Sequence, residues 1–183
     1  QVEIILHEDL HGNINMPSWQ EEAVVTPLAF LAALKFFEIT KDPHNVGATI
    51  ALIEENRKMS RELHALVKDI KDEFGKRPPY PNNGYRDDDI EFRNRLLGLI
   101  EKYPTYAKEY RYTSINQDGG SVLEAMISHD FMYYKYFDRL ISLHEKIRDL
   151  KTLIADIKSA PARSTELERF FEELEQKYER PMP

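Results

Sequence analysis

The chain has 183 residues, of which 42% are hydrophobic and 31% are charged, so it can bury a sizeable core and is not a disordered polymer. Its formal net charge of −7 repels phosphate backbones and argues against nucleic-acid binding. The absence of cysteine excludes disulfides, thiolate-bound metals, iron–sulfur clusters and cysteine nucleophiles.

The first segment, residues 1–25, is predicted to be an extended arm. Residues 2–6 (Val-Glu-Ile-Ile-Leu) are short, apolar and rich in β-branched side chains, a composition typical of a strand. A single strand cannot satisfy its own backbone hydrogen bonds, so the arm would need a partner, which another chain could supply. Gly12 and Asn13 then interrupt any regular structure.

Within this arm, the residues from His7 to His11 read His-Glu-Asp-Leu-His and have the form H-E-x-x-H. The spacing resembles the zincin metalloprotease motif, in which two histidines on one helix face bind zinc and the glutamate acts as a base. The resemblance implies His7 and His11 as ligands and Glu8 as the base, with Glu21 or Glu22 as candidates for a third ligand. Because a strand-like run precedes the motif and a glycine follows it directly, we predict a polar surface arm here and no metal.

Two helices are predicted after the arm. Thr26 and Pro27 combine a hydroxyl N-cap with proline at the first helical position, and the helix that they begin runs to Thr40. The second helix covers residues 43–74, where apolar side chains recur with a seven-residue period, and Gly75 ends it.

Loops and a third helix occupy the middle of the chain. Prolines and an Asn-Asn-Gly run make residues 75–86 a loop. Three aspartates at the start of the next segment favour the N-terminus of a helix over residues 87–103, which Pro104 interrupts. A turn follows at residues 115–120, where the chain reads Ile-Asn-Gln-Asp-Gly-Gly.

The clearest pattern covers residues 121–160. Its apolar positions recur in alternating steps of three and four residues: Tyr133, Tyr136, Leu140, Leu143, Ile147, Leu150, Ile154 and Ile157. This is the spacing of a coiled-coil seam, so it predicts one continuous amphipathic helix that Pro161 ends. A last helix is predicted from Thr165 to Tyr178, with Glu168 completing a capping box.

These patterns predict an all-α helical bundle. It would be built around two long antiparallel amphipathic helices, residues 43–74 and 121–160, in a coiled-coil-like arrangement with the extended N-terminal arm attached. Residues 26–183 would form a single helical-bundle domain. No apolar run approaches the roughly 20 residues that span a bilayer, so no membrane span is predicted.

A ligand or partner surface is predicted where the two long helices meet. Asn56 would be a polar residue in the seam of the first helix, and a buried asparagine there can fix helix register. His129, beside Asp130, lies on the seam side of the second helix. Tyrosines suit such a surface because they combine an apolar ring with a wet hydroxyl. The tyrosines assigned to it are Tyr80, Tyr85, Tyr133, Tyr134 and Tyr136.

The sequence is compatible with three functions. The patterns favour a non-catalytic interaction or scaffold protein that contacts a protein partner or a second copy of itself. One alternative is a ligand-sensing helical domain with polar and aromatic pockets between its helices. The other is a metal-dependent enzyme using His7, Glu8 and His11. On the favoured interpretation the chain has no catalytic residue and no cofactor, and it binds no nucleic acid.

Overall fold

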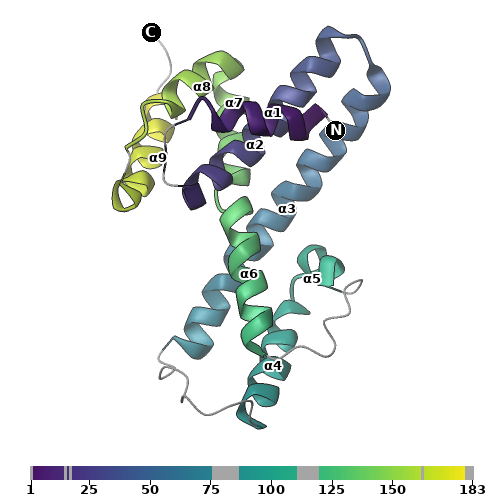
Figure 1. The fold of residues 1–183 in the computed structure, drawn as a ribbon, viewed down its shortest axis with the longest axis vertical. Helices are drawn as coiled ribbons and strands as arrows, with labels where there is room; N and C mark the ends of the chain where they lie inside the picture. The colour runs from purple at the N-terminus through teal and green to yellow at the C-terminus, as the bar shows by residue number, and fades with distance from the viewer. Residues whose placement is uncertain are drawn as a thin grey trace. The chain divides into compact units, whose positions relative to one another are not determined.

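The computed structural model describes residues 2–14, 16, 18–75, 87–110, 120–161 and 163–179. Within these ranges all regular secondary structure is helical, which confirms the predicted all-α class (Figure 1). The helices are α1 (Val2–His11), α2 (Ser18–Ile39), α3 (Pro43–Phe74), α4 (Asp87–Ile100), α5 (Pro104–Tyr110), α6 (Gly120–Tyr134), α7 (Phe137–Ile147), α8 (Leu150–Ile157) and α9 (Ser164–Glu179). None of the helices in the described ranges is both long and apolar enough to cross a membrane.

The chain divides into two compact units. Unit 1 consists of Gln1–Arg57 with Met132–Pro183, and unit 2 consists of Lys58–Phe131. The grouping of residues 26–183 into one domain stays a prediction. The predicted loop at 75–86 and the predicted turn at 115–120 lie almost entirely outside the described residues.

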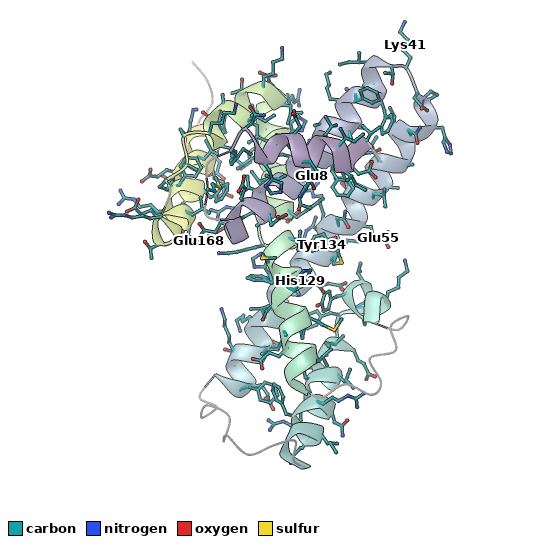
Figure 2. All side chains as sticks on the ribbon, in the orientation of Figure 1. Glu8, Lys41, Glu55, His129, Tyr134 and Glu168 are labelled. Carbon is teal, nitrogen blue, oxygen red and sulfur yellow. The ribbon has the colours of Figure 1, made fainter. Side chains whose placement is uncertain are left out.

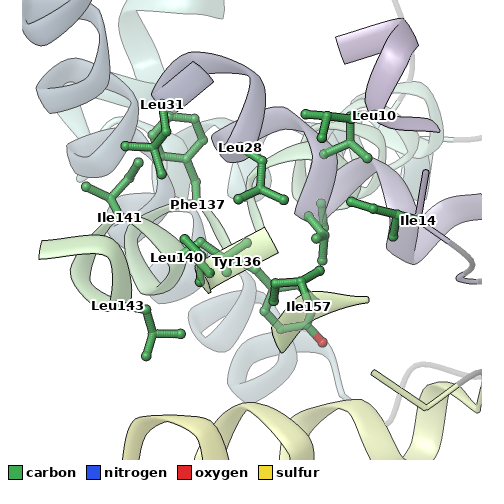
Figure 3. Packing of buried hydrophobic residues seen from close by; sticks show 14 of the residues in the cluster. Leu10, Ile14, Leu28, Leu31, Tyr136, Phe137, Leu140, Ile141, Leu143 and Ile157 are labelled. Carbon is green, nitrogen blue, oxygen red and sulfur yellow. The ribbon is translucent and has the colours of Figure 1, made fainter. Parts of the chain in front are cut away.

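Unit 1 has a core in which α2 packs against α1, α7 and α8, and α9 packs against α7. Figure 3 shows part of this core, with Leu28 of α2, Tyr136 and Phe137 at the start of α7, and Ile157 of α8. All four of these side chains are at most 2% exposed. Because burying one large apolar side chain contributes roughly 1.5–3 kcal/mol, this core is the main stabilising element of the unit.

Unit 2 has its own core of buried side chains from α3, α4, α5 and α6, among them Leu63, Phe92, Tyr106 and Leu123. Glu62 of α3 caps α5, because its carboxylate accepts hydrogen bonds from the Thr105 hydroxyl at 2.8 Å and from the Tyr106 backbone N–H at 2.9 Å. These bonds satisfy donors that a helix N-terminus leaves free.

The predicted extended arm is wrong, because residues 2–11 form α1. Val2, Leu6 and Leu10 are spaced four residues apart and so share one helix face, and Leu10 is buried in the core of unit 1. The strand propensity of the β-branched residues is therefore overridden by the burial of one helical face against α2. Ile4 and Ile5 are left exposed.

The predicted start of the next helix at Thr26 is also wrong. α2 begins at Ser18 and contains Pro27 in its interior. A proline there has no N–H to offer the carbonyl four residues earlier, which costs about 3 kcal/mol. Val24, Val25 and Leu28 surround Pro27 in sequence and are fully buried, so their packing more than offsets this cost.

α3 spans Pro43–Phe74, the range that the sequence predicts. Asp42 lies just before it, and its carboxylate accepts the backbone N–H of Asn45 at 3.1 Å. An acceptor at this position and proline at the first helical position together begin the helix.

The predicted continuous helix over residues 121–160 is wrong, because the chain is interrupted between α6 and α7 and again between α7 and α8. At the second break Arg148 has φ 57°, and Asp149 accepts the backbone N–H groups of Lys151 and Thr152. The aspartate is thus an N-cap and begins a new helix. The apolar periodicity is real, and Tyr136, together with other members of the repeat, is buried.

Candidate metal centre

The H-E-x-x-H motif lies on α1, so its two histidines are one turn apart on the same face. The helix ends directly after them. The backbone N–H groups of Asn13 and Ile14 donate to the carbonyl of Leu10 at 2.9 and 3.1 Å. The burial of Leu10 then holds α1 against α2, which brings both histidines to the first turns of that helix.

Three side chains from α1 and α2 converge: His7, His11 and Glu22. The Nε2 atoms of the two histidines are 3.0 Å apart. Oε2 of Glu22 lies 3.2 Å from Nε2 of His7, and Oε1 of Glu22 lies 3.4 Å from Nε2 of His11. Among the described residues this is the one group of three or more histidine and carboxylate side chains whose ligand atoms are close enough to hold a metal ion.

The spacing of these atoms fits a tetrahedral zinc ion. Zinc bound by nitrogen and oxygen at about 2.1 Å holds neighbouring ligand atoms about 3.4 Å apart. The observed separations of 3.0, 3.2 and 3.4 Å lie close to this value. Oε2 of Glu22 is buried and accepts no hydrogen bond from the described residues, although it lies near His7.

The donor set is also chemically suitable. Two imidazoles and one carboxylate bind zinc in hydrolases that keep the fourth position open. The same three ligands also hold iron(II) in other enzymes, but a glutamate directly after the first histidine is typical of zinc sites. His7, His11 and Glu22 are 20%, 26% and 24% exposed, so the cluster is reachable from solvent.

Glu8 lies next to the cluster on α1 and is exposed (Figure 2). Each helical residue is rotated by about 100° from its predecessor. Glu8 is therefore about 60° around the helix axis from His11, on the flank of the histidine face. A carboxylate at this place can accept a proton from a molecule bound in front of the two histidines.

Glu21 contacts His11 on the side of the ring opposite to His7 and Glu22. Its Oε1 lies 3.2 Å from Nδ1 of His11, the ring nitrogen that faces away from His7 and Glu22. The Glu21 side chain is 14% exposed and is thus the most buried member of the group. A carboxylate in this position is the usual partner of a metal-binding histidine.

Tyr133 is the predicted surface residue that the structure places near this cluster. Burial raises the pKa of its hydroxyl, and the negative charge of Glu22 raises the pKa further. The ring is half-buried at the end of α6. Tyr133 therefore belongs to the surroundings of Glu22.

The other predicted residues lie elsewhere. Tyr136 is 2% exposed and belongs to the core of unit 1, and Tyr134 packs against that core with its ring 5.9 Å from Phe137. His129 is 64% exposed, with Nδ1 3.7 Å from Oδ1 of Asp130. Asn56 is partly exposed on α3. Tyr80 and Tyr85 lie outside the described residues.

The sequence alone left Glu21 and Glu22 as alternative candidates for a third ligand and did not choose between them, because both fall in the segment predicted to be extended. One pattern indicates the correct structure, namely the four-residue spacing of Val2, Leu6 and Leu10. This spacing favours a helix over residues 2–11. On a helix, the two histidines of the H-E-x-x-H motif lie on the same face. Comparisons of the chain with known protein families, curated proteins and solved structures found no match.

Proposed function

We propose that unit 1 is a zinc-dependent hydrolase of the zincin kind, with His7, His11 and Glu22 as ligands and Glu8 as the general base. The observation that carries this proposal is the convergence of three ligand atoms at separations close to those around a tetrahedral ion. The resemblance of the motif to that of metalloproteases makes the amide bond of a peptide the proposed substrate.

The proposed reaction is the hydrolysis of a peptide bond. When bound, zinc supplies a Lewis acid that polarises the substrate carbonyl and makes water a stronger acid. The Glu8 carboxylate accepts the proton of the attacking water and returns it to the leaving amine, so one water is consumed and a carboxylic acid and an amine are released. The two histidines and Glu22 would hold the metal through the ligand atoms that converge between α1 and α2.

Elemental analysis of the purified protein tests the metal site. We expect one zinc per chain in the wild type and none in the His7→Ala variant. His44→Ala is the matched control, because His44 is an exposed histidine on α3. Protein that binds no stoichiometric zinc, either as purified or after incubation with the metal, would contradict the proposal. Stoichiometric iron in place of zinc would overturn the assignment of the metal.

A second candidate is the non-catalytic interaction or scaffold function. It is supported by large apolar side chains that are exposed at the end of α2 and the start of α3, namely Phe36, Ile39, Ile50 and Leu52. A contiguous patch of such residues marks a surface for protein contact, whereas single exposed apolar side chains are ordinary. Light scattering over a range of concentrations tests for self-association, which Ile39→Glu is expected to weaken. A wild type that stays monomeric throughout would remove a second copy as the partner.

This scaffold would use the predicted antiparallel, coiled-coil-like pairing of the two long helical segments. Arg57 of α3 supports the pairing, because its Nε lies 2.8 Å from Oδ1 of Asp138 and its Nη1 2.6 Å from Oε1 of Glu145, both on α7. Nη2 of Arg57 also donates to the Ser142 hydroxyl at 3.1 Å. All three bonds come from the one side chain of Arg57, so they support a contact between α3 and α7 at this point.

A further inference from the structure

The two neighbouring carboxylates of α2 reach different nitrogens of the same imidazole. Glu22 lies 3.4 Å from Nε2 of His11, through Oε1. Glu21 lies 3.2 Å from Nδ1 of His11, also through Oε1. One ring is therefore held between a residue on the ligand side and a residue on the opposite side.

The two nitrogens of a neutral imidazole have different roles, because one carries the proton and the other a lone pair. An ionised carboxylate can only accept a hydrogen bond, so Glu21 favours the proton on Nδ1. Nε2 is then left with its lone pair pointing to the space shared with His7 and Glu22. The opposite tautomer would place a proton on Nε2 and would block it as a ligand.

We propose that Glu21 is a positioning residue that holds His11 in the Nδ1–H tautomer and so presents Nε2 as a metal ligand. The inference rests on the proposed zinc site. His7 differs from His11 here, because its polar contacts with the described residues all involve its Nε2. Of the two histidines, His11 is thus the anchored ligand.

Burial strengthens this role. The side chain of Glu21 is 14% exposed and that of His11 is 26% exposed. The 3.2 Å separation is short enough for a hydrogen bond once an Nδ1 proton is aligned with Oε1, and partial burial strengthens such a bond. Partners of this kind orient the ring and raise its basicity as a ligand, and their removal typically lowers metal affinity about 10–100-fold.

Zinc titration against a chromophoric chelator tests the proposal on the full chain. We expect Glu21→Ala to weaken zinc binding about 10–100-fold and Glu21→Gln to recover part of the loss, because the glutamine oxygen still accepts the Nδ1 proton. Glu38→Ala is the control, since it is the same change at an exposed position of α2. The visible spectrum of the cobalt(II)-loaded protein should change in Glu21→Ala and stay unchanged in Glu38→Ala.

The tautomer can be read directly in the zinc-free wild type from the nitrogen chemical shifts of the His11 ring. Nδ1–H is the expected form, and Nε2–H would overturn the role of Glu21 whatever the metal result. Wild-type protein that binds zinc with an affinity equal to that of Glu21→Ala would also overturn it. A wild type that binds no zinc would instead refute the proposed function, so the two failures are distinguishable. If Glu21→Ala does not fold, Glu21→Gln and the tautomer still decide the question.

Discussion

The hydroxyl of Tyr136 donates a 2.9 Å hydrogen bond to Oε1 of Glu168, and this bond joins the junction of α6 and α7 to α9. Lys135 lies 2.7 Å from the same carboxylate oxygen, and Arg139 lies 3.0 Å from the other one. Burial by itself would raise the pKa of Glu168, but the hydrogen bonds from Lys135 and Tyr136 and the charge of Arg139 hold that pKa below its ordinary value. Glu168 therefore stabilises the helix break, and the predicted capping box at the start of α9 stays a prediction.

Removing the Tyr136 hydroxyl is expected to destabilise unit 1. Tyr136→Phe keeps the buried ring and loses one hydrogen bond to a charged group. We expect the free energy of unfolding to fall by roughly 1–2 kcal/mol, the lower part of the range for such bonds, because Glu168 is half exposed. Urea unfolding measures the change. A double-mutant cycle with Glu168→Ala should give a coupling energy above about 0.5 kcal/mol, and additivity of the two changes would contradict the contact.

Glu8 is expected to separate zinc binding from hydrolysis. Glu8→Gln removes the base and leaves the three ligands in place, so zinc stoichiometry should not change. Peptide hydrolysis by the zinc-loaded protein should fall at least about 100-fold, the usual effect of losing a general base. Cleavage of a fluorogenic peptide library measures the loss, with Glu3→Gln on the same helix as the control. Equal hydrolysis by Glu8→Gln and wild type would assign the base to another residue.

His144 is expected to make stability depend on pH near neutrality. Burial lowers the pKa of His144 below 6.5, and this outweighs the charges of Glu145, Asp149 and Glu38, which raise it, while Lys35 lowers it. The unfolded state then binds the proton more readily than the folded state. The contribution to stability is present above the unfolded pKa and is lost as pH falls from there through the folded pKa.

The measurement is the free energy of unfolding in urea between about pH 7.5 and pH 5, the range in which histidine titrates. The decrease on acidification should be smaller in His144→Gln than in the wild type. His44→Gln, at an exposed position of α3, should retain the wild-type slope. A slope that is identical in all three proteins would show that the burial of His144 does not affect its protonation.

Replacing Arg148 with glycine is expected to stabilise the protein. It has φ 57° between α7 and α8, a conformation that costs a side-chain-bearing residue about 1–2 kcal/mol. Arg148→Gly should therefore raise the free energy of unfolding by about 1 kcal/mol. Ala155→Gly, in the exposed middle of α8, should lower it by about 1 kcal/mol. Destabilisation by both changes would indicate a continuous helix through Arg148.

The all-α class followed from local patterns that packing did not contradict. The α3 helix matches its predicted range because Asp42 and Pro43 begin it and Gly75 follows its end. These signals act only on residues close to them in sequence, so they can be recognised without the tertiary structure. The 121–160 pattern was interpreted correctly as apolar and periodic. The continuity that this pattern predicts is wrong, because Asp149 acts as an N-cap and so competes with the helix interior.

The candidate site shows the same division. The H-E-x-x-H spacing of His7, Glu8 and His11 can be read directly from the sequence, since it involves no distant residues. Whether this spacing brings the two histidines onto one helix face, close to further ligands, depends on the packing of α1 against α2. The burial of Leu10 against α2 favoured a helix over the strand that Ile4 and Ile5 prefer, and the same packing brought Glu21 and Glu22 to the histidines. Local propensities contribute tenths of a kcal/mol per residue, whereas burying one large apolar side chain contributes roughly 1.5–3 kcal/mol. Packing therefore determined that residues 2–11 form a helix.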